Sequence, residues 1–124
     1  MNIVLWILQI LVSLMFVFHS YILGVRYEQT QMQQGMKWGG DIPSGLRIFI
    51  AICEVLGGVG LILPALTGIL PWLTPLAAAL LALMMLLAAG FHVTRREYPN
   101  IVLNLILLAL AAFVAYGRFV IVPL

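Results

Sequence analysis

The chain has 124 residues, of which 65% are hydrophobic and only 8% are charged. A soluble domain has about 25% charged residues, so this composition excludes a water-soluble globular protein and predicts an integral membrane protein surrounded by lipid. The formal net charge is only +2. No nucleic-acid partner is therefore expected, and the basic residues are better interpreted as signals of membrane topology.

Four segments are long and apolar enough to cross a bilayer core, which requires about 20 helical residues. They are residues 2–24, 45–66, 75–93 and 99–117. Ser44 and Thr74 are expected to cap the second and third helices. The predicted fold class is all-α: one transmembrane domain over residues 1–124, an integral membrane four-helix bundle. Its helical hairpins are joined by one long polar connection, residues 25–43, which we expect to lie on the membrane surface.

Prolines mark the turn between the second and third segments. Residues 61–75 contain three prolines and Gly68, which indicates a tight hairpin rather than one long span. Pro64 is expected to kink or end the second helix. Cys53 is the single cysteine of the chain, so it forms no internal disulfide, and we interpret it as a packing residue.

The distribution of lysine and arginine indicates the orientation. Basic residues flank the connections 25–43 and 94–98, whereas Arg118 is alone on the opposite side. Positive residues are enriched in cytoplasmic loops, which predicts that both connections are cytoplasmic and that both termini face outside.

Glu54 is the one acidic residue that the sequence places well inside the lipid. A carboxylate at that depth costs about 2.5–3.5 kcal/mol on insertion scales, so such residues usually have a function. The alternative is structural: a protonated carboxyl group could hydrogen-bond to a neighbouring helix and hold the two helices together.

Each helix carries one face of polar and small residues when positions are spaced at about 100°. Small residues allow membrane helices to approach closely, and polar residues point inward, so these faces predict a compact bundle. The faces comprise Gln9, Ser13, Phe16 and Ser20; Arg47, Glu54, Gly58, Leu61 and Ala65; Ala78, Ala82, Met85, Ala89 and His92; and Asn100, Asn104, Leu107, Ala111, Ala115 and Arg118.

Several polar residues fall in the half of the membrane that faces the basic connections. Counting helical rise from the ends of the segments places them at similar depths and predicts a polar pocket that opens toward Arg47 and Arg95. The candidate ligand-binding residues are Glu54, His92, Asn104, His19, Arg47 and Ser20.

Each candidate also has a structural interpretation. His19 lies about 100° from Ser20, so it can serve a helix contact. His92 can complement a helix dipole, and Asn104 can form an interhelical hydrogen bond. The spacing of histidines and acidic residues predicts no metal site, because no helix carries two ligands one turn apart. No catalytic residue is assigned, and whether a reaction is catalysed is left open.

Two stretches of the sequence resemble the DoxX-like family of small bacterial membrane proteins. Glu54 begins the pattern E-x-x-G-x-x-G-L-x-x-P, and Pro71 begins P-W-L-T-P-x-A-A. His92 before Arg-Arg-Glu and Arg118 after Tyr-Gly also fit. The first helix differs from that of many family members, in which the helix ends in a glycine and a lysine. In this chain the same region reads His-Ser-Tyr-Ile-Leu-Gly-Val-Arg.

The resemblance implies a four-helix bundle in the bacterial inner membrane. The family takes its name from a subunit linked to thiosulfate oxidation with quinone as acceptor, and other members are associated with redox stress or with quinone and catechol detoxification. The sequence and the resemblance favour binding of a small hydrophobic molecule, a lipid or a quinone around Glu54. The alternatives are an accessory subunit of a quinone-linked oxidoreductase, with a redox partner protein, and an assembly or scaffold protein. A homo-oligomer is left open. No cofactor other than a quinone is expected.

Overall fold

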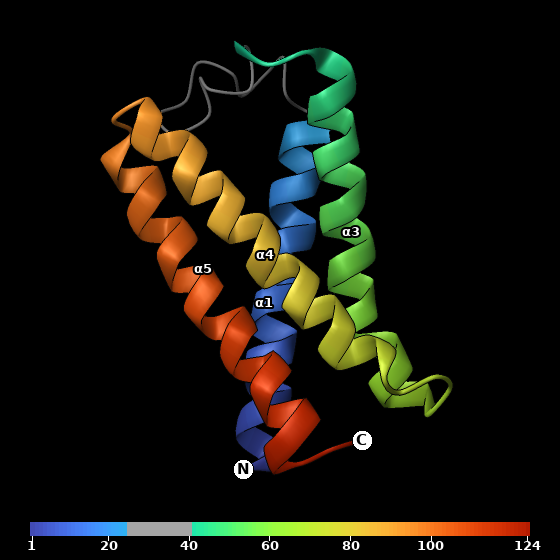
Figure 1. Ribbon diagram of the computed structural model, residues 1–124. Coiled ribbons are helices and arrows are strands. Elements are labelled where there is room, and N and C mark those ends of the chain that lie inside the picture. The colour runs from blue at the N-terminus through green and yellow to red at the C-terminus, as the bar shows by residue number, and fades with distance from the viewer. Residues whose placement is uncertain (25–40) are drawn as a thin grey trace.

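The structure is a computed structural model and describes residues 1–24 and 41–124 (Figure 1). The predicted surface location of the long connection therefore concerns residues that lie mostly outside the described part. The helices are α1 (Asn2–Gly24), α3 (Ser44–Thr67), α4 (Leu73–Thr94) and α5 (Tyr98–Tyr116), and α5 continues into the π-helical turn η2 (Gly117–Ile121). All four long helices have the length and composition to cross a membrane, which confirms the predicted fold class.

Two helix starts differ from the predictions. Ser44 is the first residue of α3 rather than its cap, and Pro43 precedes it without a side-chain capping bond. Helix α4 begins at Leu73, so Thr74 lies inside the helix. The Thr74 hydroxyl donates instead to the carbonyl oxygen of Gly60 at 3.1 Å.

Pro64 explains why that carbonyl group is available. A helical carbonyl accepts from the N–H four residues later, and proline has no N–H. The oxygen of Gly60 therefore has no partner within α3, and Thr74 of α4 supplies one. Helix α3 continues past Pro64 to Thr67 and is capped by Gly68, whose φ of 72° lies in the left-handed region that glycine adopts without strain. Of the two predicted effects of Pro64, a kink or an end of the helix, the end is wrong, because Pro64 lies inside α3.

The helices form two pairs, α1 with α3 and α4 with α5. Helices α3 and α4 meet near their hairpin and diverge toward the opposite end of the molecule (Figure 1). A Cβ atom on Gly60 would lie 2.9 Å from that of Ala77, and one on Gly57 would lie 2.6 Å from Leu81 Cδ2. These glycines form a close-packing surface, and they bring the two pairs together at the hairpin.

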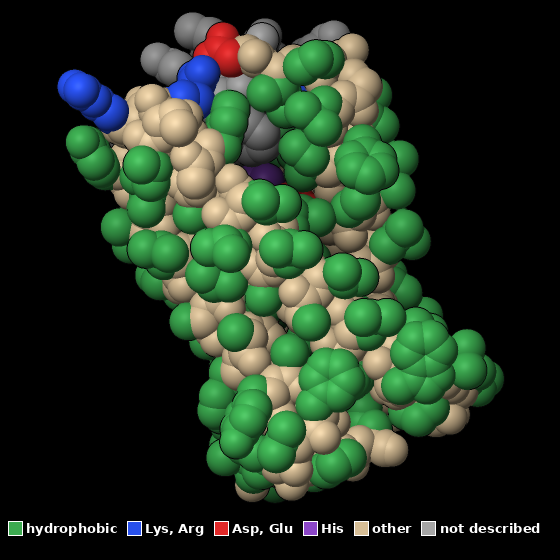
Figure 2. Space-filling model, in the orientation of Figure 1, with side chains coloured by type: hydrophobic (Ala, Val, Ile, Leu, Met, Phe, Trp, Pro, Cys, Tyr) green, Lys and Arg blue, Asp and Glu red, His purple; other side chains and the backbone are tan. Residues whose placement is uncertain are grey.

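We call the end with residues 41–43 and 94–98 the basic end, and the end with both chain termini the terminal end (Figure 1). The predicted inward faces are largely confirmed, because their members on α1 and α4 are all buried. The outer surface is dominated by exposed leucine, isoleucine, valine and phenylalanine side chains (Figure 2). Such a surface is suited to lipid and not to water.

Candidate functional site

A row of α1 side chains donates to backbone oxygens of α3. Gln9 Nε2 lies 2.7 Å from the oxygen of Leu61, and Ser13 Oγ lies 2.8 Å from that of Gly58. Gly58 permits this contact, because a Cβ there would lie 2.9 Å from Val17 Cγ2. The bonds fix the rotation of α1 against α3.

Further along the same interface, His19 and Glu54 form a hydrogen-bonded pair. His19 Nδ1 lies 2.8 Å from Glu54 Oε2. Glu54 is only 1% exposed, whereas 36% of the His19 side chain is accessible. A proton lies between the two groups whether the imidazole or the carboxyl group donates it. The pair is therefore a site where a proton is held inside the bundle.

Asn104 of α5 is the third polar group at this level. Its side chain is buried, with 8% exposed, and it lines the same cavities as His19 and Glu54. Within residues 1–24 and 41–124, its Nδ2 atom has no hydrogen-bond partner. A buried donor without a partner costs about 1–3 kcal/mol, so this amide is poised to donate to an acceptor that enters the cavity.

A groove of about 1280 Å³ runs along α3 and α4 beside these residues. It extends from Ile42 and Pro99 at the basic end to Pro64 and Leu73 near the hairpin. Leucine, isoleucine, methionine and phenylalanine side chains make up most of its wall. Figure 2 shows a hollow between the upper parts of α3 and α4, with a histidine side chain at its floor. We call this cavity the α3–α4 groove.

A second, smaller cavity of about 220 Å³ lies between α1 and α5. Its wall includes Met15, Phe18 and Ile22 of α1 and Leu107 of α5. Five residues line both cavities: His19, Glu54, Met85, Leu103 and Asn104. The three polar residues of this group, His19, Glu54 and Asn104, therefore lie between two cavities whose walls are mostly apolar.

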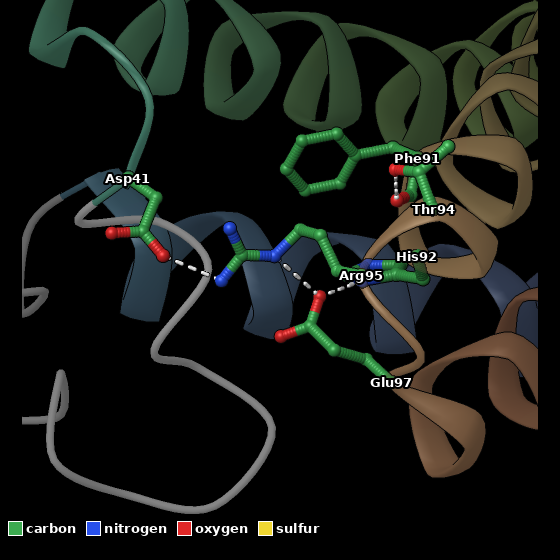
Figure 3. A network of polar contacts seen from close by, with 6 residues as sticks. All are labelled: Asp41, Phe91, His92, Thr94, Arg95 and Glu97. Carbon is green, nitrogen blue, oxygen red and sulfur yellow. Dashed lines mark hydrogen bonds and ion pairs between the residues drawn. The ribbon is translucent and has the colours of Figure 1, made fainter.

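His92 takes part in a separate network at the basic end (Figure 3). Its Nδ1 lies 2.8 Å from Glu97 Oε1, and Arg95 Nε donates to the same oxygen at 2.9 Å. Arg95 also pairs with Asp41, which precedes α3, and its guanidinium lies 5.5 Å from the ring centroid of Phe91. The network thus connects the α4–α5 turn with the chain that enters α3.

The charges of this network stabilise one another. Partial burial disfavours the charge on Glu97, but hydrogen bonds from His92 and Arg95, with the nearby positive charge, outweigh this effect and lower the pKa of Glu97. Hydrogen bonds to Glu97 and Asp41 raise the pKa of Arg95. Glu97 and Arg95, which lie outside the spanning helices, are therefore paired in their charged forms.

The six predicted ligand-binding residues separate into three groups. His19, Glu54 and Asn104 come together at the two cavities, and His92 lines the α3–α4 groove while it contacts Glu97. Ser20 is buried, and its hydroxyl donates to the Val17 oxygen of its own helix. Neither Ser20 nor Arg47 is among the lining residues of either cavity, whereas Asn100 lines the groove.

A polar cluster around Arg118 was not assigned from the sequence. The Arg118 side chain is 2% exposed; its Nε donates to Gln9 Oε1 at 2.6 Å, and its Nη1 donates to Asn2 Oδ1 at 2.8 Å. Its guanidinium also lies 5.7 Å from the ring centroid of Trp6. The positions of Gln9 and Arg118 on inward faces were the available signal, but the contact between the first and last helices is not readable from one sequence.

The described residues contain no group of three or more His, Cys, Asp or Glu side chains that could hold a metal ion. The site is therefore one of hydrogen-bonding groups beside apolar walls. Pockets for small molecules usually have this character: mostly apolar walls with a few convergent polar groups.

A sequence model of the DoxX-like family matches residues 7–114. The match covers all of α3 and α4 and most of α1 and α5. No curated protein and no solved structure matches the chain.

Proposed function

The chain belongs to the DoxX-like family, and we propose that it binds a small, largely apolar molecule with an uncharged polar group in the α3–α4 groove. The observation that carries the proposal is the buried Asn104 amide without a partner, next to the His19–Glu54 pair at the groove wall. An acceptor oxygen on the ligand would take the Asn104 hydrogen bond, and the pair would donate or accept a second one.

The depth of the site restricts the ligand. Glu54 lies ten residues after Ser44, which places it about 15 Å into the membrane along α3, near the middle of a core about 30 Å thick. A charged headgroup is costly at that depth. The ligand therefore carries a neutral group such as a carbonyl or hydroxyl, and it enters from the bilayer rather than from water.

A quinone is the ligand class that we would test first. Its carbonyl oxygens need hydrogen-bond donors, which the Asn104 amide and the His19–Glu54 pair supply, and its reduction consumes protons, of which the pair holds one. Electrons would come from a redox partner protein.

Position in the cell is part of the proposal. We place the protein as a single transmembrane domain in the bacterial inner membrane, with the basic end in the cytoplasm and the termini outside. The excess of lysine and arginine at the basic end supports this orientation.

The test is mass spectrometry of molecules that co-purify with the protein in mild detergent. Wild type is compared with Glu54→Gln and Asn104→Leu, which keep the size of each side chain, and with Glu97→Gln as a matched control for the carboxylate change. We expect an apolar molecule on wild type and Glu97→Gln, and at least about tenfold less on the other two variants.

A short-chain ubiquinone added to ligand-stripped protein tests the quinone directly. If the folded Glu54→Gln and Asn104→Leu proteins retain the same molecules as wild type, or if wild type carries and binds none, the binding proposal fails. The scaffold alternative then gains support when Gly58→Leu alone disrupts a complex with another membrane protein.

A further inference from the structure

The α3–α4 groove differs in polarity along its length. Within the described residues, the polar side chains that line it are His19, Glu54, His92, Asn100 and Asn104. All of them lie between the level of Glu54 and the basic end, where α1 and α4 end and α5 begins. From Glu54 to the hairpin, the lining residues are leucine, alanine, methionine, proline and glycine. The groove therefore has a polar half toward the basic end and an apolar half toward the hairpin.

The two ends of the groove also differ in charge. At the basic end, the groove begins beside the ion pairs of Arg95 with Asp41 and Glu97. The hairpin turn between α3 and α4, residues 68–72, contains no charged side chain. An apolar chain that pointed toward the basic end would finish beside ions and their water, whereas one that points toward the hairpin contacts hydrocarbon along its whole length. The distribution of charge favours the second direction.

The apolar half has a defined length. Pro64 is the last residue of α3 that lines the groove, and it follows Glu54 by ten residues, which corresponds to about 15 Å of helix. Leu73, the first residue of α4, lines the groove at the same end. An extended chain of single bonds advances about 1.2 Å per bond. About twelve bonds of an apolar chain therefore span the distance from the level of Glu54 to the hairpin.

We propose that the ligand binds in one direction, with its uncharged polar group at one end of the molecule, beside Asn104 and the His19–Glu54 pair, and with an apolar chain that runs along the groove to the hairpin. About twelve bonds of this chain contact the protein, and any further carbons extend past Leu73 into lipid. This inference rests on the function proposed above and adds the direction of the ligand and the length of chain that the groove recognises.

Contacts with the groove wall explain the dependence on chain length. In a bilayer or a detergent micelle the chain is already in an apolar medium, so burial from water contributes little. Each carbon that lies against the wall gains dispersion contacts instead. We therefore expect binding to strengthen by about threefold as the chain grows from about six to about twelve carbons, and to change by less than about 1.5-fold from twelve to sixteen.

Photochemical labelling of the wild-type protein determines the direction. Two methyl ketones with about twelve chain carbons provide the probes: one has a diazirine close to the carbonyl group, and the other has it at the far end of the chain. Each is irradiated with the purified protein in mild detergent, and the labelled peptides are identified by mass spectrometry. We expect the far-end probe to label Pro64, Leu73 and their neighbours, and the near-carbonyl probe to label the surroundings of Cys53 and Asn104. Excess unlabelled ketone should suppress both.

A pair of α4 variants tests the length. Leu76 lines the groove near the hairpin, so Leu76→Trp fills part of its apolar half. Leu86→Trp is the matched control, because Leu86 lies on the same helix, is 54% exposed and is not among the lining residues of the groove. Methyl ketones of the three chain lengths compete with the near-carbonyl probe. We expect Leu76→Trp to remove the gain between six and twelve carbons and to leave the shortest ketone unchanged, whereas Leu86→Trp retains the gain.

The results that would overturn the inference are distinguishable from failure of the proposed function. If the far-end probe labels Leu46, Phe49 or Phe91 and excess ketone suppresses this labelling, the direction is wrong while the binding site stands. If binding rises from twelve to sixteen carbons as steeply as from six to twelve, the length limit is wrong. If the folded Asn104→Leu protein is labelled like wild type and excess ketone suppresses neither, the proposed function itself fails.

Discussion

Glu54 and Arg118 are the two most deeply buried charged residues of the described spanning helices, and their surroundings differ. Glu54 is bonded to His19 and stands beside two cavities. Arg118 is held by Gln9 and Asn2 and lies under Trp6, and it is not among the lining residues of either cavity. Both regions contain a buried nitrogen without a partner within the described residues, Asn104 Nδ2 and Arg118 Nη2. The comparison teaches that two buried charges can differ in their access to space: cavities adjoin Glu54 but not Arg118, and for this reason we propose a binding role for Glu54 alone.

The largest effect that would test this comparison is on stability. Arg118→Ala removes three hydrogen bonds, to Gln9, Asn2 and the backbone oxygen of Val122, and leaves a void among packed side chains. We expect a loss of about 2–4 kcal/mol in the free energy of unfolding. The change is measured by thermal or denaturant unfolding in detergent. Ligand content per folded molecule should stay at the wild-type level, and a folded Arg118→Ala protein without ligand would break the distinction.

The second prediction concerns the α1–α3 contact on which the Glu54 site depends. A valine at Gly58 would clash with Val17 and approach the backbone oxygen of Ser13, which lies 3.3 Å from the position of the new Cβ. Gly58→Val should cost about 1–3 kcal/mol by overpacking. Gly90→Val is the control, because a Cβ at Gly90 meets nothing within 4 Å. Equal unfolding temperatures for the two variants would contradict this account.

The third prediction is a double-mutant cycle on the His19–Glu54 pair. His19→Leu leaves a buried carboxyl group without its partner and should cost about 1–2 kcal/mol. The double variant His19→Leu/Glu54→Leu should recover most of that loss, because both polar groups are replaced by apolar ones. Unfolding curves of wild type, His19→Leu, Glu54→Leu and the double variant measure the coupling. Additive losses would mean that the pair is not an interacting unit.

The smallest expected effect is at the basic end. Because the pKa of Glu97 is lowered in the folded protein, its ionised form stabilises the fold. This contribution is fully present above the pKa of an unfolded glutamate and is lost as the pH falls through the lowered pKa. The difference in unfolding between wild type and Glu97→Gln should therefore be larger at about pH 7 than at about pH 3. A difference of the same size at both values would assign the effect to packing.

Much of the fold follows from patterns that are local in the sequence. Segment length and hydrophobicity identify the four spanning helices, and helical periodicity identifies buried residues such as Ser13 and Met85. The depth argument predicts that His19, Glu54 and Asn104 lie in the same half of the membrane, and in the structure all three line both cavities. The pairing of His19 with Glu54 was harder to anticipate, since a helical wheel places His19 beside the best inward face and ignores the reach of its ring.

The unpredicted features depend on how the helices are placed in space. The α3–α4 groove exists because the two helices diverge from their hairpin. The helical periodicity of the sequence contains no information about this divergence. The Gln9–Arg118 contact joins residues 109 positions apart, and a single sequence by itself carries no signal for it. Two facts are needed to predict the contact of Thr74 with Gly60. Pro64 leaves the Gly60 oxygen without a partner in α3, and the packing of α4 brings Thr74 next to it.

That contact between Thr74 and Gly60 has a mechanical consequence. Helices that are joined near one end and apart at the other can change their separation only by turning about the joined end. A rotation of about 5° at Gly60 moves the start of α3, about 24 Å away, by about 2 Å, whereas Glu54, about 9 Å away, moves by less than about 1 Å. Such a rotation would widen the groove at the basic end, where it must first break the Arg95–Asp41 pair, and it would change the surroundings of Glu54 much less.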